Sequence, residues 1–520
     1  MNKNESLTSK WGLVSSLTLF SRLVGYARDV LIAYLFGASY QTDAFYVAFR
    51  IPNLLRRLFA EGSLTVAFIP IFTDYIKNKG KESAGQALNS IFTMVFIAVA
   101  LISIIGILLS PIIVNLFAYG FDRETYELTV TLNRIMFPYI LFISIAALSM
   151  GVLNTINHFF APAVSPVVFN LTIICSAYFL YGHLHNPTIS LAIGVLIGGF
   201  LQLVVNIPFL ISKGYLFGFT RRIFHPAVKR LGLLITPQLF GLAVYNVNIL
   251  VNTQFASYMP TGTVSYLYFS ERLIEFPLGI VAVSIATVLL PTLADDVKSD
   301  DFPSFRNNFK YMLRLMLFVI VPALVGLAIL RVPICSVLFQ RGEFTYHEVL
   351  QTSSALLGYS LGVWAVGGLR ITVPAFYSME DTKTPVIVGF FAFIINAVSC
   401  YILGFVFSLN QFGLALASTI SSIFNFLLLL YLIDKKVKDI FDITLLRYFL
   451  KVMVMSVVTG LVALYISSYI DWSIGGVDLV KLAVLATAVI FSGMLYFLMA
   501  RILGFEELDE LKNIVIRKNK

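Results

Sequence analysis

Charge is the scarcest property of this sequence, because only 12% of its 520 residues are Asp, Glu, Lys or Arg. Soluble globular domains carry about twice that share of charged residues. Apolar residues make up 58% of the chain, and the mean hydropathy is +0.86. Such a chain has too little polar surface to cover a monomer in water. The composition therefore excludes an ordinary soluble domain and indicates a membrane protein.

Cysteine and histidine are also scarce, with three and five residues. Cys175, Cys335 and Cys400 lie far apart inside apolar runs, which is typical of small buried hydrophobic residues rather than of a disulfide framework or a metal cluster. His183 and His185 form the closest histidine pair, and we interpret them as solvated loop residues. No group of Ser, Cys or carboxylate side chains is typical of a catalytic site. We therefore expect no metal, no cofactor and no enzymatic activity.

Long apolar runs recur along the whole chain and predict an all-α polytopic membrane protein with about fourteen transmembrane helices. A β-barrel would instead show strands of about ten residues with alternating polarity. The first run meets Arg22 without a small-residue cleavage site, so we expect a helix there and not a cleaved signal peptide. The predicted spans are 11–36, 44–76, 86–117, 126–156, 160–182, 189–212, 230–258, 263–295, 309–338, 347–377, 384–407, 411–433, 446–469 and 478–503.

Basic residues gather in alternate connections between these helices. The basic segments are 77–81, 213–230, 298–314, 435–451 and 512–520, whereas the segments 37–43, 181–187 and 408–413 contain almost no Lys or Arg. By the positive-inside rule we expect both termini in the cytoplasm, which requires an even number of spans. The net charge of +9 then reflects membrane topology, and we do not expect nucleic-acid binding.

The chain also repeats itself at a nearly constant spacing. Pro111 opens PIIVNLFAYG, and Pro333, 222 residues later, opens PICSVLFQRG. Residues 44–74 align without a gap on residues 265–295. The repeat spans about six helices, an even number that preserves orientation. We therefore expect two lobes related by a pseudo-two-fold axis along the membrane normal, with a cavity between them.

This repeat predicts four parts of the chain. The N-terminal lobe is 1–215 and the C-terminal lobe is 216–437. Residues 438–504 form two additional helices outside the repeat, and residues 505–520 form a cytoplasmic tail.

An unusual concentration of charge interrupts the apolar sequence between Ser21 and Pro70. Its members are Arg22, Arg28, Asp29, Asp43, Arg50, Arg56, Arg57 and Glu61. A charge at the bilayer centre costs about 2.5–3.5 kcal/mol, so about five lipid-facing arginines would cost about 15 kcal/mol, the whole stability of an ordinary domain. The arginines must therefore face a polar interior or reach the membrane surface from helix ends. An interior lined with arginine predicts an anionic cargo.

Helical spacing predicts partners for some of these charges. Arg22 and Asp29 are seven residues apart and share a helix face, while Arg28 points elsewhere. Arg57 and Glu61 are one turn apart, which favours an ion pair.

The second half of the chain contributes fewer buried charges. Glu271 and Glu275 lie one turn apart, with Arg272 beside them. Arg134 and Arg370 are two further cations inside predicted spans.

Arginine suits a phosphate-bearing cargo because its planar guanidinium donates two parallel hydrogen bonds and stays charged. We predict cargo contact for Arg22, Arg28, Arg56 and Arg272. The supporting residues are Asp29, Asp43, Arg57, Glu61, Glu271 and Glu275, and we expect Asp29 and Asp43 to orient arginines rather than hold a cation. For Arg50, Arg57, Arg134 and Arg370 the favoured interpretation is structural pairing or a position at a helix end.

At these residues the sequence resembles the MurJ (MviN) family, the lipid II flippases of the MOP transporter superfamily. The resemblance runs through essentially the whole chain. It is carried by SRLVGYARD (21–29), GASYQTDAFYVAFRIPNLLRRLFAEG (37–62), FPYIL (137–141), GVLNTINHFFAPA (151–163) and YFSERLIEFPLGI (268–280). One departure is Glu271, where aspartate is expected in relatives.

The resemblance implies two six-helix lobes around a central cationic cavity. It implies that Arg22, Arg28, Asp43, Arg56 and Arg272 match positions important for flipping, and that the last two helices line a groove for a polyprenyl tail. The implied function is alternating-access transport of undecaprenyl-pyrophosphate-linked peptidoglycan precursor across the bacterial cytoplasmic membrane, where cell-wall synthesis proteins are possible partners.

Three alternatives stay open. A cation-coupled antiporter of the MATE type would need a site rich in carboxylates and aromatics, whereas this interior is biased toward arginine. A flippase for another polyprenyl-linked saccharide would use similar arginines. A membrane scaffold would bind anionic lipid without moving it between leaflets.

Overall fold

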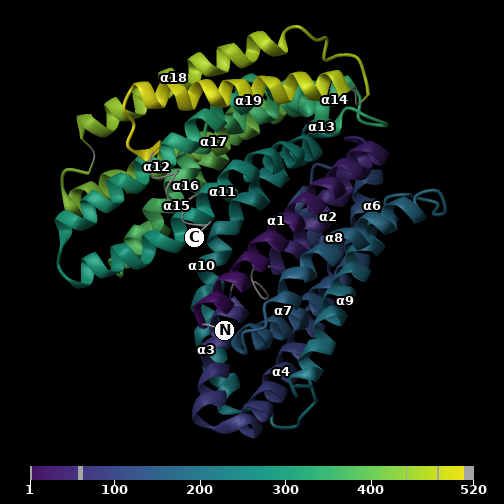
Figure 1. Cartoon of the computed structure of the whole chain (residues 1–520). Helices are drawn as coiled ribbons and strands as arrows, with labels where there is room; N and C mark the ends of the chain where they lie inside the picture. The colour runs from purple at the N-terminus through teal and green to yellow at the C-terminus, as the bar shows by residue number, and fades with distance from the viewer. Residues whose placement is uncertain (1–2, 57–62, 441, 477–478, 509–520) are drawn as a thin grey trace. The chain divides into compact units, whose positions relative to one another are not determined.

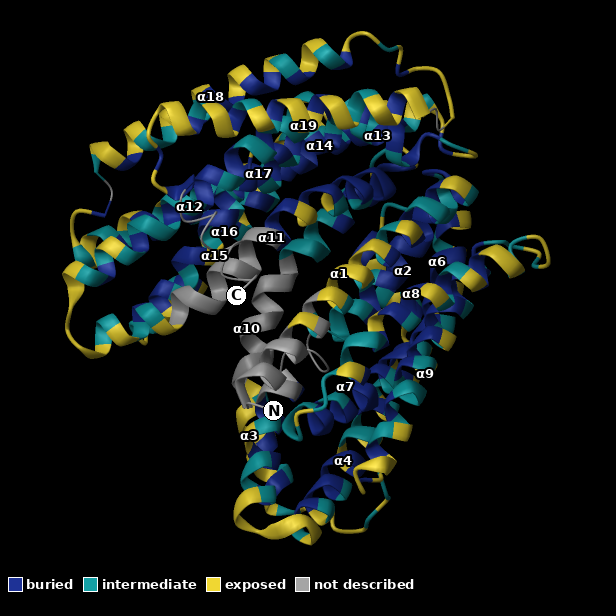
Figure 2. Cartoon of the chain, in the orientation of Figure 1, coloured by how far each residue is buried: buried dark blue, intermediate teal, exposed yellow. Residues whose placement is uncertain are grey.

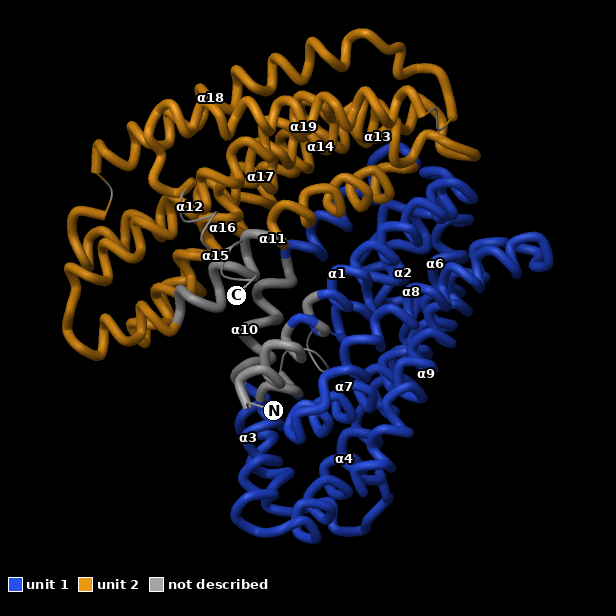
Figure 3. The backbone as a smooth tube through the Cα atoms, in the orientation of Figure 1, with its two compact units in different colours: residues 1–261 blue, residues 262–520 orange. Residues whose placement is uncertain are grey.

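The structure is a computed structural model that describes residues 3–56, 63–440, 442–476 and 479–508 (Figure 1). Two of the predicted supporting residues, Arg57 and Glu61, lie outside the described residues. The chain forms two compact units, residues Met1–Thr261 and Gly262–Lys520, called unit 1 and unit 2 below (Figure 3). Every regular element in the described ranges is a helix.

Unit 1 contains ten helices in its described part. They are α1 (Lys3–Phe36), α2 (Tyr40–Arg56), α3 (Ser63–Asn78), α4 (Gly80–Leu108), α5 (Ser110–Ala118), α6 (Arg123–Met136), α7 (Tyr139–Thr155), α8 (Phe160–Leu180), α9 (Ile189–Ser212) and α10 (Pro226–Ser257).

Unit 2 contains ten more in its described part. They are α11 (Thr263–Lys298), α12 (Phe302–Ile329), α13 (Arg331–Phe339), α14 (Tyr346–Ser360), α15 (Val363–Ser378), α16 (Lys383–Tyr401), the π-helix η2 (Ile402–Val406), α17 (Asn410–Val437), α18 (Ile443–Ser467) and α19 (Leu479–Ile502).

Several predicted helices are broken where the sequence carries a helix-terminating signal. The predicted span 86–117 divides into α4 and α5, because Pro111 lies in the first turn of the second helix, where its missing N–H is tolerated. The span 126–156 divides into α6 and α7 at Pro138. The span 347–377 is the pair α14 and α15, which meet at a bend of 43°. A kink at Pro138 is expected from the proline in that span, whereas the breaks near Pro111 and between α14 and α15 were not predicted.

Nine described helical segments are long and apolar enough to cross a membrane, and the bent pair α14–α15 brings the number to ten. The chain is therefore an all-helical multi-pass membrane protein. Among the other predicted spans, α1 carries three charges in its C-terminal half, and α2, with 17 residues, is shorter than a membrane span.

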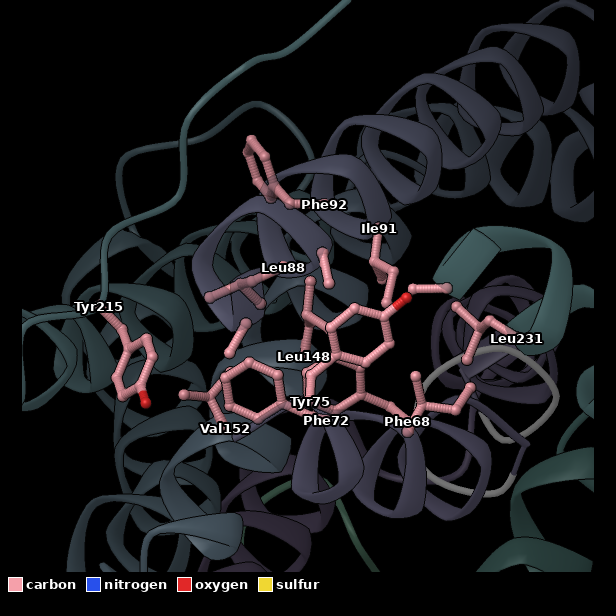
Figure 4. Close-up of a cluster of buried hydrophobic side chains, with 14 of the residues drawn as sticks. Phe68, Phe72, Tyr75, Leu88, Ile91, Phe92, Leu148, Val152, Tyr215 and Leu231 are labelled. Atoms are coloured by element: carbon pink, nitrogen blue, oxygen red, sulfur yellow. The ribbon is translucent and has the colours of Figure 1, made fainter. Parts of the chain in front are cut away.

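The core of unit 1 is a cluster of large side chains from α3, α4 and α7 (Figure 4). Phe68 and Phe72 stack with ring centroids 5.0 Å apart, and Phe72 meets the edge of Tyr215 at 5.5 Å. Leu231 closes the cluster from α10, which packs against α3, α4 and α5. The first helix of the second sequence repeat therefore belongs to unit 1 by contact. The sequence division at residue 215 follows the repeat and stays a prediction.

The repeat is visible in the backbone of the two units. Asn157 and Glu380, 223 residues apart, both adopt the left-handed conformation, with φ of 60° and 59°. Each residue follows the second helix of a broken pair and precedes a long apolar helix, α8 or α16. The corresponding turns at Gly80 and Asp300 also have positive φ, 81° and 55°.

Helices α18 and α19 form a pair at the end of unit 2, where α18 packs against α12 and α19 packs against α18 and α13. Both helices expose much of their apolar surface (Figure 2). Asp442 fixes the start of α18, because its Oδ1 accepts hydrogen bonds from Leu445 N at 2.9 Å and Thr444 Oγ1 at 2.6 Å. Its Oδ2 lies 2.7 Å from Lys310 Nζ on α12.

Partial burial raises the pKa of the Asp442 carboxyl, but the bonds from Lys310, Thr444 and Leu445 outweigh it and hold the pKa well below its usual 3.8. A lowered pKa in the folded state contributes stability above the usual pKa, and this contribution is lost as the pH falls below it.

We predict that Asp442→Asn, which keeps the Oδ1 acceptor, lowers the free energy of unfolding by about 0.5–1 kcal/mol at pH 7 through loss of the ion pair. Asp442→Ala also loses the cap and should cost about 1 kcal/mol more. Thermal unfolding of the purified protein measures both. The difference between wild type and Asp442→Asn should shrink below about pH 4.

The matched control is Asp301→Asn, because Asp301 caps α12 through Ser304 N at 3.0 Å in the same way. This control should be nearly neutral. If the asparagine and alanine variants of Asp442 lost the same free energy of unfolding, the helix cap would contribute nothing beyond the ion pair, which contradicts the prediction.

Candidate functional site

The predicted site residues of unit 1 lie on α1 and α2. Arg28 is buried in the C-terminal half of α1, with 7% of its side chain exposed. Its Nε and Nη2 donate to Asp29 Oδ1 at 3.0 and 2.7 Å, and Asp29 is also buried. The prediction that Arg28 points away from Asp29 was wrong, because its long side chain folds back to the neighbouring carboxylate. Arg22, which was predicted to share a helix face with Asp29, is exposed.

Asn170 on α8 completes the surroundings of Arg28. Its Oδ1 accepts a hydrogen bond of 3.0 Å from Arg28 Nη1, and its Nδ2 donates to Pro166 O at 3.1 Å. Gly25 faces this amide, and a Cβ there would lie 3.5 Å from Asn170 Nδ2. A distance of 3.5 Å is an ordinary van der Waals contact, so α1 and α8 lie next to each other at the level of the charge.

Sequence analysis did not single out Asn170. The available signal was a lone amide within the apolar run FAPAVSPVVFNLTIICSAYFL of α8. A polar side chain inside a membrane helix faces the protein interior and needs a partner. In this chain the partner is the buried guanidinium of Arg28.

Asp43 and Arg56 lie at opposite ends of α2. Asp43 is buried in the first turn, where the helix dipole stabilises a carboxylate. Arg56 is half-buried in the last turn, where the dipole favours a cation, and its Nε donates to Asn53 Oδ1 at 2.9 Å. Both Arg28 and Arg56 lie close enough to the buried Tyr139 to interact with it electrostatically. The structure therefore brings these two predicted cargo residues to one region of unit 1.

Arg50 and Arg370 make structural hydrogen bonds to other helices of their own units. Arg50 Nη1 donates to Thr253 Oγ1 on α10 at 2.6 Å. Arg370 Nη1 donates to Leu278 O on α11 at 3.0 Å. Arg134, in the last turn of α6, is exposed. These positions agree with the structural interpretation of the three arginines, which stays a prediction.

In unit 2, the Arg272 side chain on α11 contacts Tyr268 and Glu275 of the same helix. Its Nη1 lies 2.8 Å from Glu275 Oε2, and its Nε and Nη2 donate to Tyr268 Oη at 3.2 and 3.1 Å. The guanidinium carbon lies 5.3 Å from the centroid of the Tyr268 ring. About a third of the Arg272 side chain is exposed, at 34%. The neighbouring Glu271 is exposed.

These arrangements can hold an anion by charge and by hydrogen bonds. Arg28 is fixed by a carboxylate and an amide, while Arg56 and Arg272 are less buried. Partnered arginines arrive at an anionic group already oriented, which lowers the entropic cost of binding. Within the described residues no three His, Cys, Asp or Glu side chains come together as a metal site.

Comparisons with known proteins agree on one family. The family description "Lipid II flippase MurJ" matches residues 32–505. A curated "Lipid II flippase MurJ" from Burkholderia cenocepacia is 35% identical over 502 residues, which cover 95% of this chain and 96% of that protein. A solved structure, "Lipid II flippase MurJ, inward closed conformation", is 30% identical, has a TM-score of 0.79, and is matched over 94% of this chain and 99% of that one.

A more distant likeness concerns the fold alone. An inward-facing MATE multidrug transporter of the MOP superfamily has a TM-score of 0.67 at 14% identity, over 82% of this chain and 98% of that one.

We predict that Asn170→Ala lowers the free energy of unfolding by about 1.5–3 kcal/mol, because it removes a buried acceptor of a charged donor. Asn206→Ala is the matched control, since Asn206 on α9 is buried in a neutral network with Ser165 Oγ at 2.9 Å and Gln202 O at 2.7 Å. The control should lose only about 0.5–1.5 kcal/mol. Thermal unfolding in detergent measures both, and equal losses would contradict a special role of the charge.

Proposed function

Because the chain belongs to the MurJ family of lipid II flippases, we propose that it moves lipid II from the inner to the outer leaflet of the bacterial cytoplasmic membrane. The family consists of transporters, so the chain is not an enzyme. The observation that carries the proposal is the match over residues 32–505, which includes α2, with its candidate arginines, and α11 with Arg272.

The proposed topology has fourteen transmembrane spans and both termini in the cytoplasm. Ten of these spans are the helical segments that are long and apolar enough to cross a membrane, with the bent pair α14–α15 counted as one. The other four correspond to α1, the α2–α3 segment, α10 and α11. Three of these four segments contain candidate cargo arginines, which a membrane helix tolerates where it faces a protein interior.

The proposed mechanism is alternating access between two pseudo-symmetric lobes. The repeated left-handed residues Asn157 and Glu380 and the repeated helix breaks support a common ancestry of the two halves. In this mechanism Arg22, Arg28, Arg56 and Arg272 hold the pyrophosphate and sugar head during the crossing, because a guanidinium matches phosphate oxygens with two parallel bonds. Asp29 and Glu275 orient Arg28 and Arg272.

We propose that α18 and α19 offer the polyprenyl tail an apolar surface. Large exposed hydrophobic residues cover both helices, among them Val454 at 62%, Leu461 at 55% and Met494 at 64%. A lipid tail can lie on such a surface without leaving an apolar environment.

A second candidate function is cation-coupled antiport of a small molecule, which the MATE-like fold favours. The arginine-rich surroundings of α1 and α2 argue for an anionic cargo instead. The decisive experiment is leaflet-resolved accessibility of lipid II in cells depleted of this protein. Accumulation in the inner leaflet supports the proposed function, and an unchanged distribution contradicts it.

We predict that Arg28→Lys, Arg56→Lys and Arg272→Lys each impair growth in a depletion strain, because lysine keeps the charge but loses the planar fork. A lost charge-assisted bond is worth about 1.5–3 kcal/mol, or a roughly 10- to 150-fold fall in transport. Arg123→Lys is the matched control, because Arg123 is an exposed arginine paired with Glu127 at 2.8 Å. It should grow like wild type.

We also predict that removing both members of a pair does not restore function. Arg28→Ala with Asp29→Ala, and Arg272→Ala with Glu275→Ala, leave no unpaired charge behind, so both proteins should reach the membrane at near-normal levels. They should still fail to support growth because the cargo loses its cation. Wild-type growth of either double variant would mean that the arginines are only structural.

Deleting α18 and α19 by truncation near Lys436 should abolish lipid II transport while the rest of the chain still folds. Membrane abundance and protease resistance report folding in parallel with complementation. Full complementation by the truncated chain would refute the role proposed for the pair.

A further inference from the structure

A second cationic surface lies in unit 1, apart from the residues assigned to the cargo. It consists of the connection between α9 and α10, residues 213–225, together with Lys79 and Lys81 at the start of α4, and we call it the interfacial surface. Two hydrogen bonds lay the connection along α4: Gly218 N donates to Asn89 Oδ1 at 2.9 Å and Thr220 N to Thr93 Oγ1 at 3.1 Å. Because the two acceptors are one helical turn apart, the connection runs along the helix rather than away from it.

Aromatic side chains of the connection also pack against α4, closer to the lipid-facing part of that helix. Phe217 stacks on Phe92 at 4.8 Å. Phe219 contacts Phe92 at 5.2 Å and Phe96 at 5.1 Å, yet 68% of it is exposed. The next turns of α4 carry a stripe of exposed apolar residues: Ile97, Leu101, Ile104 and Leu108. Phe219 thus lies at one end of a lipid-facing stripe, where membrane proteins concentrate aromatic residues.

Phe224 is the most exposed large hydrophobic side chain of the described residues, at 95%. It follows Arg221 and Arg222, which are also exposed. The aromatic core cluster holds the other side of this connection in place through Tyr215 (Figure 4). The exposed aromatic residue and the two arginines therefore lie on the outer side of a connection whose inner side is packed against the cluster.

The charges around this surface are almost all positive. Residues 213–230 contain no Asp or Glu. Lys79 Nζ lies 4.3 Å from the Tyr75 ring, which contacts the His225 ring at 5.7 Å. Burial lowers the pKa of His225, and the nearby charges of Lys79 and Arg222 lower it further.

The few acidic groups near this surface reduce its net positive charge only slightly. The carboxylate of Asp74 already pairs with Arg230 at 2.9 Å. Glu82 lies in the first turn of α4, where the helix dipole favours it. The interfacial surface therefore keeps a net positive charge.

We propose that the interfacial surface binds the headgroups of anionic phospholipids in the surrounding leaflet. Charge complementarity and continuity with the lipid-facing stripe of α4 select this occupant. Exposed arginines and lysines beside a membrane are attracted to anionic lipid by about 1 kcal/mol each, equivalent to about fivefold in affinity. Phe219 and Phe224 hold the connection at the boundary between headgroups and acyl chains.

Native mass spectrometry of the full-length protein, with phosphatidylglycerol and phosphatidylcholine of equal chain length, tests the proposal. Wild type should retain phosphatidylglycerol preferentially. Arg221→Gln with Arg222→Gln should weaken its retention about 25-fold and leave phosphatidylcholine unchanged. Lys435→Gln with Lys438→Gln removes the same charge from the C-terminal end of α17 in unit 2. It should change retention less than twofold, because Asp434 and Asp439 offset the positive charge there.

Equal retention of the two lipids by wild type, or equal losses in the two double variants, would overturn the proposal. Displacement of phosphatidylglycerol by an equal concentration of glycerol 3-phosphate would instead indicate a site for small phosphate anions, and would also overturn it.

A second measurement tests membrane contact directly. Phe224→Trp places a fluorophore at the most exposed point of the surface. In lipid nanodiscs its added emission should be quenched by brominated phosphatidylglycerol and protected from aqueous acrylamide. Strong quenching by acrylamide without quenching by the brominated lipid would show that the surface faces water, which contradicts the proposal.

Discussion

The structure depends on how a cation is kept inside an apolar bundle. An unpaired guanidinium at membrane depth costs several kcal/mol, so the chain must supply charge and hydrogen-bond acceptors at the same level. Arg28 receives both, a carboxylate from its own helix and an amide from α8. The bond to Asn170 also joins α1 to α8 at the level of the charge. The residue that would be most costly to bury thus links two helices, and its bonds hold the guanidinium in one orientation.

The two halves share a backbone plan but differ in chemistry. Asn157 and Glu380 occupy the same left-handed turn, yet the next residue in each half has a different role. His158 packs against Phe209 at 4.8 Å in unit 1, whereas Asp381 in unit 2 accepts a hydrogen bond from Lys436. Backbone breaks are retained because they set helix lengths in a membrane of fixed thickness. Side chains are free to diverge, which allows one half to concentrate arginines.

Much of this fold could be predicted from the sequence, because membrane helices are recognised by the length and hydrophobicity of their apolar runs. The predicted span 189–212 coincides with α9, and most other ends fall within a few residues. The break at Pro111 escaped prediction because proline is tolerated inside apolar runs. The sequence could single out the charged segment as a candidate site, which stays a prediction, but it could not predict the geometry of the side chains. Helical periodicity predicts only the direction of the Cβ atom. The arginine side chain is long enough for Arg28 to reach the adjacent Asp29 from a different face. Asn170 escaped because its partner is 142 residues away.

A transporter of anionic lipid faces a problem of competition, because the surrounding leaflet offers anionic headgroups in large excess. Exposed cations such as Arg221 and Arg222 act in high dielectric and are screened by salt, so each attracts lipid only weakly. Arg28 acts in a low-dielectric interior, where the same charge interacts more strongly but every contact must be geometrically satisfied. A single-phosphate headgroup can satisfy the surface, whereas a pyrophosphate presents more oxygens to several oriented guanidinium groups at once. Under the two proposals made above, burial, rather than the number of arginines, is what separates binding of the cargo from binding of the bulk lipid.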